Sequence, residues 1–95
     1  MKVVLVEKAL DDLNGILAWI ARDNPASADS TLKRIYDEIE PLGRLPRLGH
    51  QTRARNTFEW VVSESSHVVI CQIDPGRDEL IVAGVFWGSQ QARRS

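Results

Sequence analysis

The sequence predicts an α+β domain with the element order β-α-α-β-β-β, in which a helical hairpin packs on one face of a small antiparallel sheet. In the second half, two apolar runs flank Asp-Pro-Gly-Arg-Asp at residues 74–78, a pattern typical of a β-hairpin. In the first half, apolar residues recur every three or four positions on both sides of an Asn-Pro pair, as expected for two amphipathic helices. Ninety-five residues suffice for one modest core, so we expect a single domain over residues 1–95.

The first half predicts a short strand followed by two helices. The strand is expected at Lys2–Val6, and the first helix runs from Glu7 to near Asp23. Asn24 suits the position that caps the second helix, and Pro25 suits its first turn, where a missing N–H costs nothing. Pro41 should end or kink this helix in its last turn, because proline cannot donate the helical hydrogen bond.

The second half predicts three strands, near residues 57–62, 68–73 and 80–87. The first of them alternates polar and apolar residues, which suits a half-buried strand. The other two are apolar at almost every position, whereas a sheet with one wet face should alternate. The helices can cover one face, so we expect a partner to cover the other.

Charge is unevenly placed along the chain, although the formal net charge is only −1. Between residues 44 and 55 the chain has four arginines and His50 but no acidic residue. Such a segment could meet a polyanion or an acidic protein surface, or it could be a solvated loop.

Residue patterns that would carry chemistry are scarce. The sequence has no Gly-rich phosphate loop, no HExxH and no nucleophile elbow, and Cys71 is its only cysteine, so we expect neither a metal nor another cofactor. Histidine can act as a general acid or base because it titrates near neutrality, but His50 and His67 are isolated in the sequence. Glu59 with Arg53 or Arg55 could form an acid–base pair across a phosphodiester, or simply an exposed ion pair.

No stretch of the sequence has the length and apolar character of a membrane span, and the apolar run near Met1 is too short for a signal peptide. We therefore expect a cytoplasmic protein that does not contact the membrane.

The assembled pattern resembles the ParE branch of the RelE/ParE toxin superfamily, and the resemblance covers nearly the whole chain. It rests on the order and spacing of five segments: residues 9–13, 20–28, 35–42, 45–49 and 85–91. The resemblance implies a β-α-α-β-β-β toxin encoded beside an antitoxin that wraps it. A ParD-like antitoxin would supply the missing cover for the second sheet face.

The resemblance implies one of two modes of action. RelE-like members are ribosome-dependent mRNA endoribonucleases with basic residues on the sheet and a catalytic tyrosine or histidine near the C-terminus. Here Val68 and Gln72 stand where such enzymes tend to carry arginine, and the only tyrosine, Tyr36, falls in the second helix. The sequence is similar to ParE members in lacking that set, which implies inhibition of DNA gyrase without catalytic residues.

This sequence also departs from common ParE patterns. An arginine usual in the late strands is replaced, and Trp87 stands where a histidine is usual. A detoxified module that only binds the antitoxin is therefore an alternative, as is the ribonuclease.

The resemblance and the charge pattern together yield hypotheses about single residues. Arg53, Arg55 and Trp87 are candidates for contact with gyrase, and Val68 and Ile70 for contact with the antitoxin. No catalytic residue, no metal ligand and no direct sequence-specific nucleic-acid binding are expected.

Overall fold

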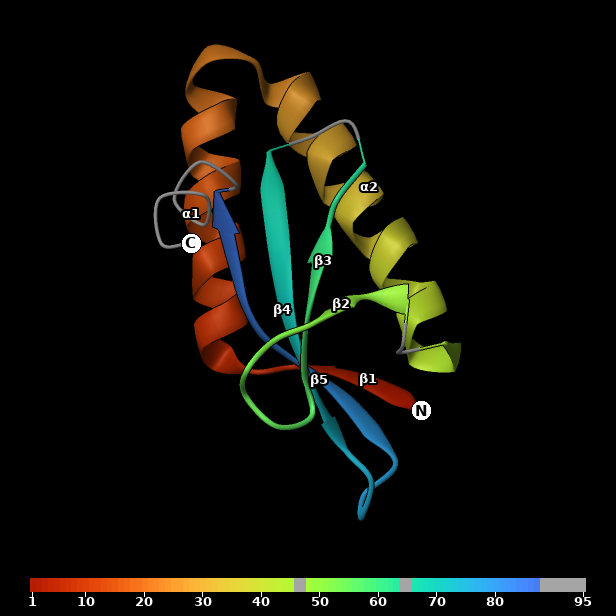
Figure 1. The fold of residues 1–95 in the computed structure, drawn as a ribbon. Helices are drawn as coiled ribbons and strands as arrows, with labels where there is room; N and C mark the ends of the chain where they lie inside the picture. Colours follow the sequence, from red (N-terminus) through yellow and green to blue (C-terminus); the bar gives the residue numbers. More distant parts are fainter. Residues whose placement is uncertain (46–47, 64–65, 88–95) are drawn as a thin grey trace.

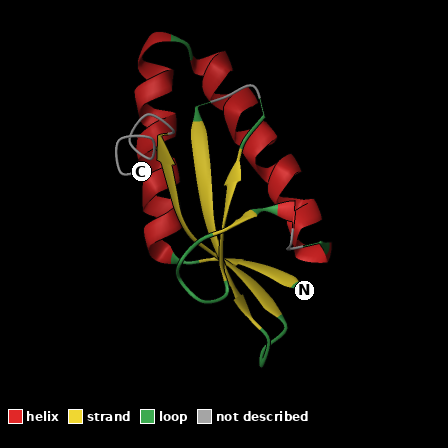
Figure 2. Cartoon of the chain, viewed as in Figure 1, coloured by secondary structure: helices red, strands yellow, loops and turns green. Residues whose placement is uncertain are grey.

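The computed structural model describes residues 1–45, 48–63 and 66–87 of the chain. Two helices lie against one side of a five-stranded sheet (Figures 1 and 2). The elements are β1 (Lys2–Leu5), α1 (Glu7–Asp23), α2 (Pro25–Arg44), β2 (His50–Gln51), β3 (Thr57–Val61), β4 (His67–Asp74) and β5 (Glu79–Trp87). The α+β class and the expected order are thereby confirmed, with the two-residue strand β2 added before β3.

The helix boundaries follow from the capping residues. The side chain of Asn24 accepts a hydrogen bond from the Ser27 N–H at 3.2 Å, and Pro25 is the first residue of α2. The helix continues past Pro41 to Arg44, and the Leu45 N–H donates to the Pro41 carbonyl at 2.9 Å. Pro41 therefore lies within the last turn and does not end the helix, although it removes the N–H that would donate to the Asp37 carbonyl.

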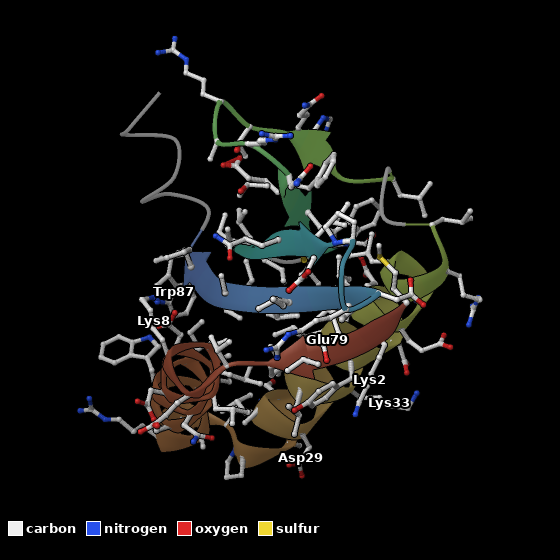
Figure 3. The ribbon with its side chains drawn as sticks, turned by 90° about the horizontal axis from the view of Figure 1, so that it is seen from below. Lys2, Lys8, Asp29, Lys33, Glu79 and Trp87 are labelled. Carbon is white, nitrogen blue, oxygen red and sulfur yellow. The ribbon has the colours of Figure 1, made fainter. Side chains whose placement is uncertain are left out.

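The sheet is mixed rather than antiparallel throughout, with strand order β1-β5-β4-β3-β2. The β5–β4, β4–β3 and β3–β2 pairs are antiparallel, whereas β1 pairs with β5 in parallel, Lys2 opposite Glu79 and Leu5 opposite Val82. Lys2 and Glu79 accordingly lie near one another in Figure 3. The orientation of β1 is a tertiary property, because the residue pattern of a strand does not determine which strand will be its neighbour.

The core lies between the helices and the face of the sheet that they cover. Ile35 and Ile39 of α2 and Ala9 of α1 are almost fully buried there, against Val69 of β4 and Val82 of β5. Since side chains alternate along a strand, Val68 and Ile70 point to the opposite face, which we call the open face. The helices thus cover one face only, as the sequence predicts.

Helix α1 also closes an edge of the sheet. Strand β5 continues past the end of β1, which leaves the Val85 N–H at the edge, and the Asp12 carboxylate of α1 accepts from it at 3.2 Å. Lys8 donates to the same carboxylate at 2.7 Å and lies over the Phe86 ring, 4.6 Å from its centroid. These contacts fix the last residues of β5 against α1.

Candidate functional site

The two candidate arginines lie in the loop between β2 and β3, residues 52–56, and both are exposed. Hydrogen bonds within the loop hold its shape: the Thr52 N–H donates to the Thr57 carbonyl at 3.0 Å, and the Ala54 N–H donates to the Thr52 hydroxyl at 3.1 Å. Asn56 adopts a left-handed φ of 55°, a conformation that asparagine tolerates better than most residues. The loop is therefore an ordered turn that displays Arg53 and Arg55 to solvent.

Trp87 lies at the other end of the sheet. The loop ends at Thr57 of β3, which lies opposite Gln72 of β4, and Gln72 lies opposite Ile81 of β5. Along β5, Trp87 is six residues beyond Ile81. At about 3.3 Å per residue, the separation is roughly 20 Å. Trp87 packs against the core on the helix side, and the centroid of its ring lies 4.6 Å from that of the His67 ring. The structure thus does not bring the three candidate gyrase contacts into one site.

The two candidate antitoxin contacts lie side by side on the open face. Val68 sits between Val61 of β3 and Phe86 of β5 in the register of the sheet and is only 4% exposed. Ile70 is half-buried, and Val61 is 54% exposed. The apolar surface that a partner could bury on this face therefore comes more from Val61 and Ile70 than from Val68.

The structure pairs two residues that are nine positions apart in the sequence. His50 of β2 stands opposite Glu59 of β3, and directly opposed residues in an antiparallel pair have Cβ atoms about 5 Å apart. Within the described part of the chain, neither Arg53 nor Arg55 forms an ion pair with Glu59. The sequence shows no sign of this pairing, because a two-residue strand leaves no periodic pattern.

The other titratable candidates lie elsewhere. His67 is buried at the start of β4, and this burial lowers the pKa of its imidazole from 6.5. Tyr36 is exposed on α2, behind the sheet. Burial in β4 raises the pKa of the Cys71 thiol to about 11, so this cysteine is unreactive at neutral pH.

A groove of about 660 Å³ lies between β1 and α2, and sequence reasoning missed it. Val3, Leu5, Tyr36 and Ile39 give it an apolar lining, and Asp37 and Glu40 add two carboxylates. The Lys2 N–H donates to the Asp78 carbonyl, just before β5, and the Val6 N–H donates to the Val82 carbonyl of β5. Because main-chain groups alternate along a strand, those of Val3 and Leu5 point to the free edge of the sheet. An extended or helical segment of a partner could occupy this groove.

Among the described helices, none is long and apolar enough to cross a membrane.

Comparison with known proteins identifies relatives of this chain. A family model described as the ParE toxin of the type II toxin–antitoxin system parDE matches residues 3–92. No curated protein sequence matches at a significant level.

Solved toxin structures share the fold at low sequence identity. The chromosomal ParDE system from P. aeruginosa matches with a TM-score of 0.79 at 14% identity, over 92% of this chain and 95% of that chain. The isolated E. coli RelE toxin matches with a TM-score of 0.64 at 14% identity, over 98% and 96% of the two chains. The RelBE2 complex from Mycobacterium tuberculosis matches with a TM-score of 0.57 at 18% identity, over 90% and 95%.

Proposed function

We propose that this chain, which belongs to the ParE toxin family of type II toxin–antitoxin systems, acts by binding DNA gyrase and does not cleave RNA. The observation that carries the proposal is the dispersal of its reactive side chains. A ParDE system gives a higher TM-score, 0.79, than the RelE and RelBE2 structures, at 0.64 and 0.57. That order supports a ParE-type activity.

Cleavage of RNA by its own 2′-hydroxyl needs a base for that proton and cations at the phosphate, all within hydrogen-bond reach of one another. In the described residues, His67 is buried against Trp87 and Tyr36 lies on α2, so neither shares a site with Arg53 and Arg55 in the β2–β3 loop. Only His50 and Glu59, on the two strands that this loop joins, lie next to one another. Inhibition by binding requires no such convergence, only an accessible surface.

Toxins of this family pair with an antitoxin, and we infer that a ParD-like antitoxin binds this chain at two apolar surfaces. One is the open face, where Val61 and Ile70 beside Val68 supply the exposed apolar surface. The other is the groove between β1 and α2, whose free strand edge and apolar lining suit a segment that adds main-chain hydrogen bonds. We place the complex in the cytoplasm, where gyrase acts.

One observation favours the ribonuclease alternative. The His50–Glu59 pair puts two groups capable of proton transfer next to one another on the sheet. A third possibility, a detoxified module that binds only the antitoxin, is consistent with the replacement of the usual histidine by Trp87.

Parallel assays on the purified chain distinguish these functions. We expect loss of gyrase supercoiling activity and intact mRNA in a translating extract, with Glu59→Gln and His50→Ala as potent as the wild type. Codon-positioned mRNA cuts that disappear in either variant would establish the ribonuclease instead. If the chain affects neither reaction and its expression does not slow growth, the detoxified module is the better account.

A further inference from the structure

We propose that the β2–β3 loop, residues 52–56, binds the phosphate backbone of the DNA held by gyrase. This inference rests on the proposed function and specifies the ligand of the loop as DNA phosphates rather than an acidic protein surface.

The loop is ordered before any ligand binds. In addition to the hydrogen bonds that Thr52 makes with Ala54 and Thr57, the Thr57 N–H donates to the Ala54 carbonyl at 3.2 Å, and the Ile73 N–H of β4 donates to the Asn56 carbonyl at 2.8 Å. The loop is thus tied both to itself and to the neighbouring strand. An ordered loop loses little conformational entropy on binding, unlike a flexible solvated loop of arginines.

The donors of Arg53 and Arg55 are uncommitted. Within the described residues, neither guanidinium takes part in an ion pair, and the N–H groups of these two residues make no main-chain hydrogen bond. By contrast, Lys8, Lys33 and Arg44 on the helices are each paired with a carboxylate four residues away. The loop therefore offers unused guanidinium and main-chain donors.

The composition of the loop favours phosphate as the ligand. Residues 50–57 read His-Gln-Thr-Arg-Ala-Arg-Asn-Thr, with hydrogen-bonding side chains at almost every position and no carboxylate. Arginine forks, uncharged polar side chains and main-chain N–H groups are the usual contacts to DNA phosphates. Because the net charge of the chain is −1, it has no general attraction to DNA, so the contact should be local. At physiological salt it should depend on gyrase to present the duplex, whereas at low salt the two arginines should bind a free duplex weakly.

The position of the loop leaves it free while the antitoxin groove is occupied. Strands β2 and β3 form the edge of the sheet opposite β1, and the groove lies on the β1 side. A change in the loop should therefore leave binding at the groove intact.

The test measures binding of the full chain to gyrase with and without DNA, at about 50 and 200 mM salt. Each phosphate contact adds about 0.9 to the slope of log K against log salt, so loss of two contacts should reduce the slope by roughly 1.8. For the DNA-bound enzyme, we expect wild type to lose about tenfold more affinity over this range than Arg53→Gln/Arg55→Gln. Affinity for DNA-free gyrase should be equal for the two proteins.

Two further variants serve as controls. Arg53→Lys/Arg55→Lys keeps both charges and should retain most of the salt slope. Arg22→Gln/Lys33→Gln removes two charges from the helices and should behave as wild type toward DNA-bound gyrase.

The outcomes separate this inference from the proposed function. If the double glutamine variant loses affinity equally with and without DNA, the loop contacts protein and the inference is wrong, while gyrase remains the target. An unchanged affinity and salt slope would also overturn it.

If wild type does not bind gyrase, the proposed function fails. Binding of the chain to a short fluorescent duplex at low salt then tests the loop by itself. Equal binding of wild type and the double glutamine variant in that assay would refute a phosphate site.

Discussion

Among substitutions of the surface carboxylates described here by alanine, Glu38→Ala should destabilise the fold most. Glu38 lies on α2 and its carboxylate accepts from three donors: the Trp60 indole N–H at 3.0 Å, the Ser63 N–H at 3.0 Å and the Ser63 hydroxyl at 3.1 Å. It joins the helix layer to the end of β3. Its loss would loosen both elements at once.

The magnitude follows from the environment of each donor. The two donors of exposed Ser63 can turn to water, so we assign them about 0.5 kcal/mol each. The indole N–H is half-buried and would be left without an acceptor, which costs about 1 kcal/mol or more. The sum is about 2 kcal/mol, or a fall in Tm of roughly 10 °C for a domain of this size.

Thermal and urea unfolding followed by tryptophan fluorescence would measure this effect. The neighbouring Asp37→Ala serves as the matched control, because the contact of Asp37 is an exposed ion pair with Lys33 at 2.9 Å, worth less than 1 kcal/mol. If Glu38→Ala were no more destabilising than Asp37→Ala, these three hydrogen bonds would not be holding β3 to α2.

Other predictions follow from the same structure. Gly43→Ala should lower the free energy of unfolding by about 1–3 kcal/mol, because the new Cβ would lie 2.9 Å from the Met1 carbonyl oxygen. Gly15→Ala should raise it by about 0.5–1 kcal/mol, because nothing lies within 4 Å of the new Cβ and alanine favours the helix. Chemical denaturation measures both changes, and the same sign for the two variants would contradict the geometry. Because burial lowers the pKa of His67, the unfolded state binds its proton more readily, so stability should be full above about pH 6.5 and fall at lower pH. His67→Phe should flatten that dependence in unfolding curves between pH 7 and 5, and an unchanged curve would exclude His67 as its source. Cys71 should resist alkylation by iodoacetamide at pH 8 until the chain unfolds, and rapid labelling of the native chain would show that the thiol is accessible.

Local rules predict much of this fold because they act on neighbouring residues. Asn24 and Pro25 specify the start of α2, and the apolar spacing of both helices determines which side they bury. The parallel pairing of β1 and the two-residue strand β2 depend on tertiary contacts, so neither leaves a local pattern. Pro41 shows that a strong local signal can also mislead by a few residues. Proline predicts the end of the helix, yet α2 continues for three more residues, to Arg44.

The candidate site is harder to predict for a physical reason. Strands β4 and β5 are apolar on both faces, so alternation does not reveal that Val68 is shielded while Val61 is open. The charge pattern does locate Arg53 and Arg55 in an exposed loop, but their distance from Trp87 follows only from the register of the sheet.

Incubation of the purified chain with gyrase, ATP and relaxed plasmid tests the central claim most directly. If the chain inhibits gyrase by binding, supercoiling should fall with toxin concentration, denaturation of the reaction should release linear plasmid from trapped complexes, and a ParD-like antitoxin should restore supercoiling. Normal supercoiling at saturating concentrations of the folded chain, with no trapped cleavage, would contradict the account.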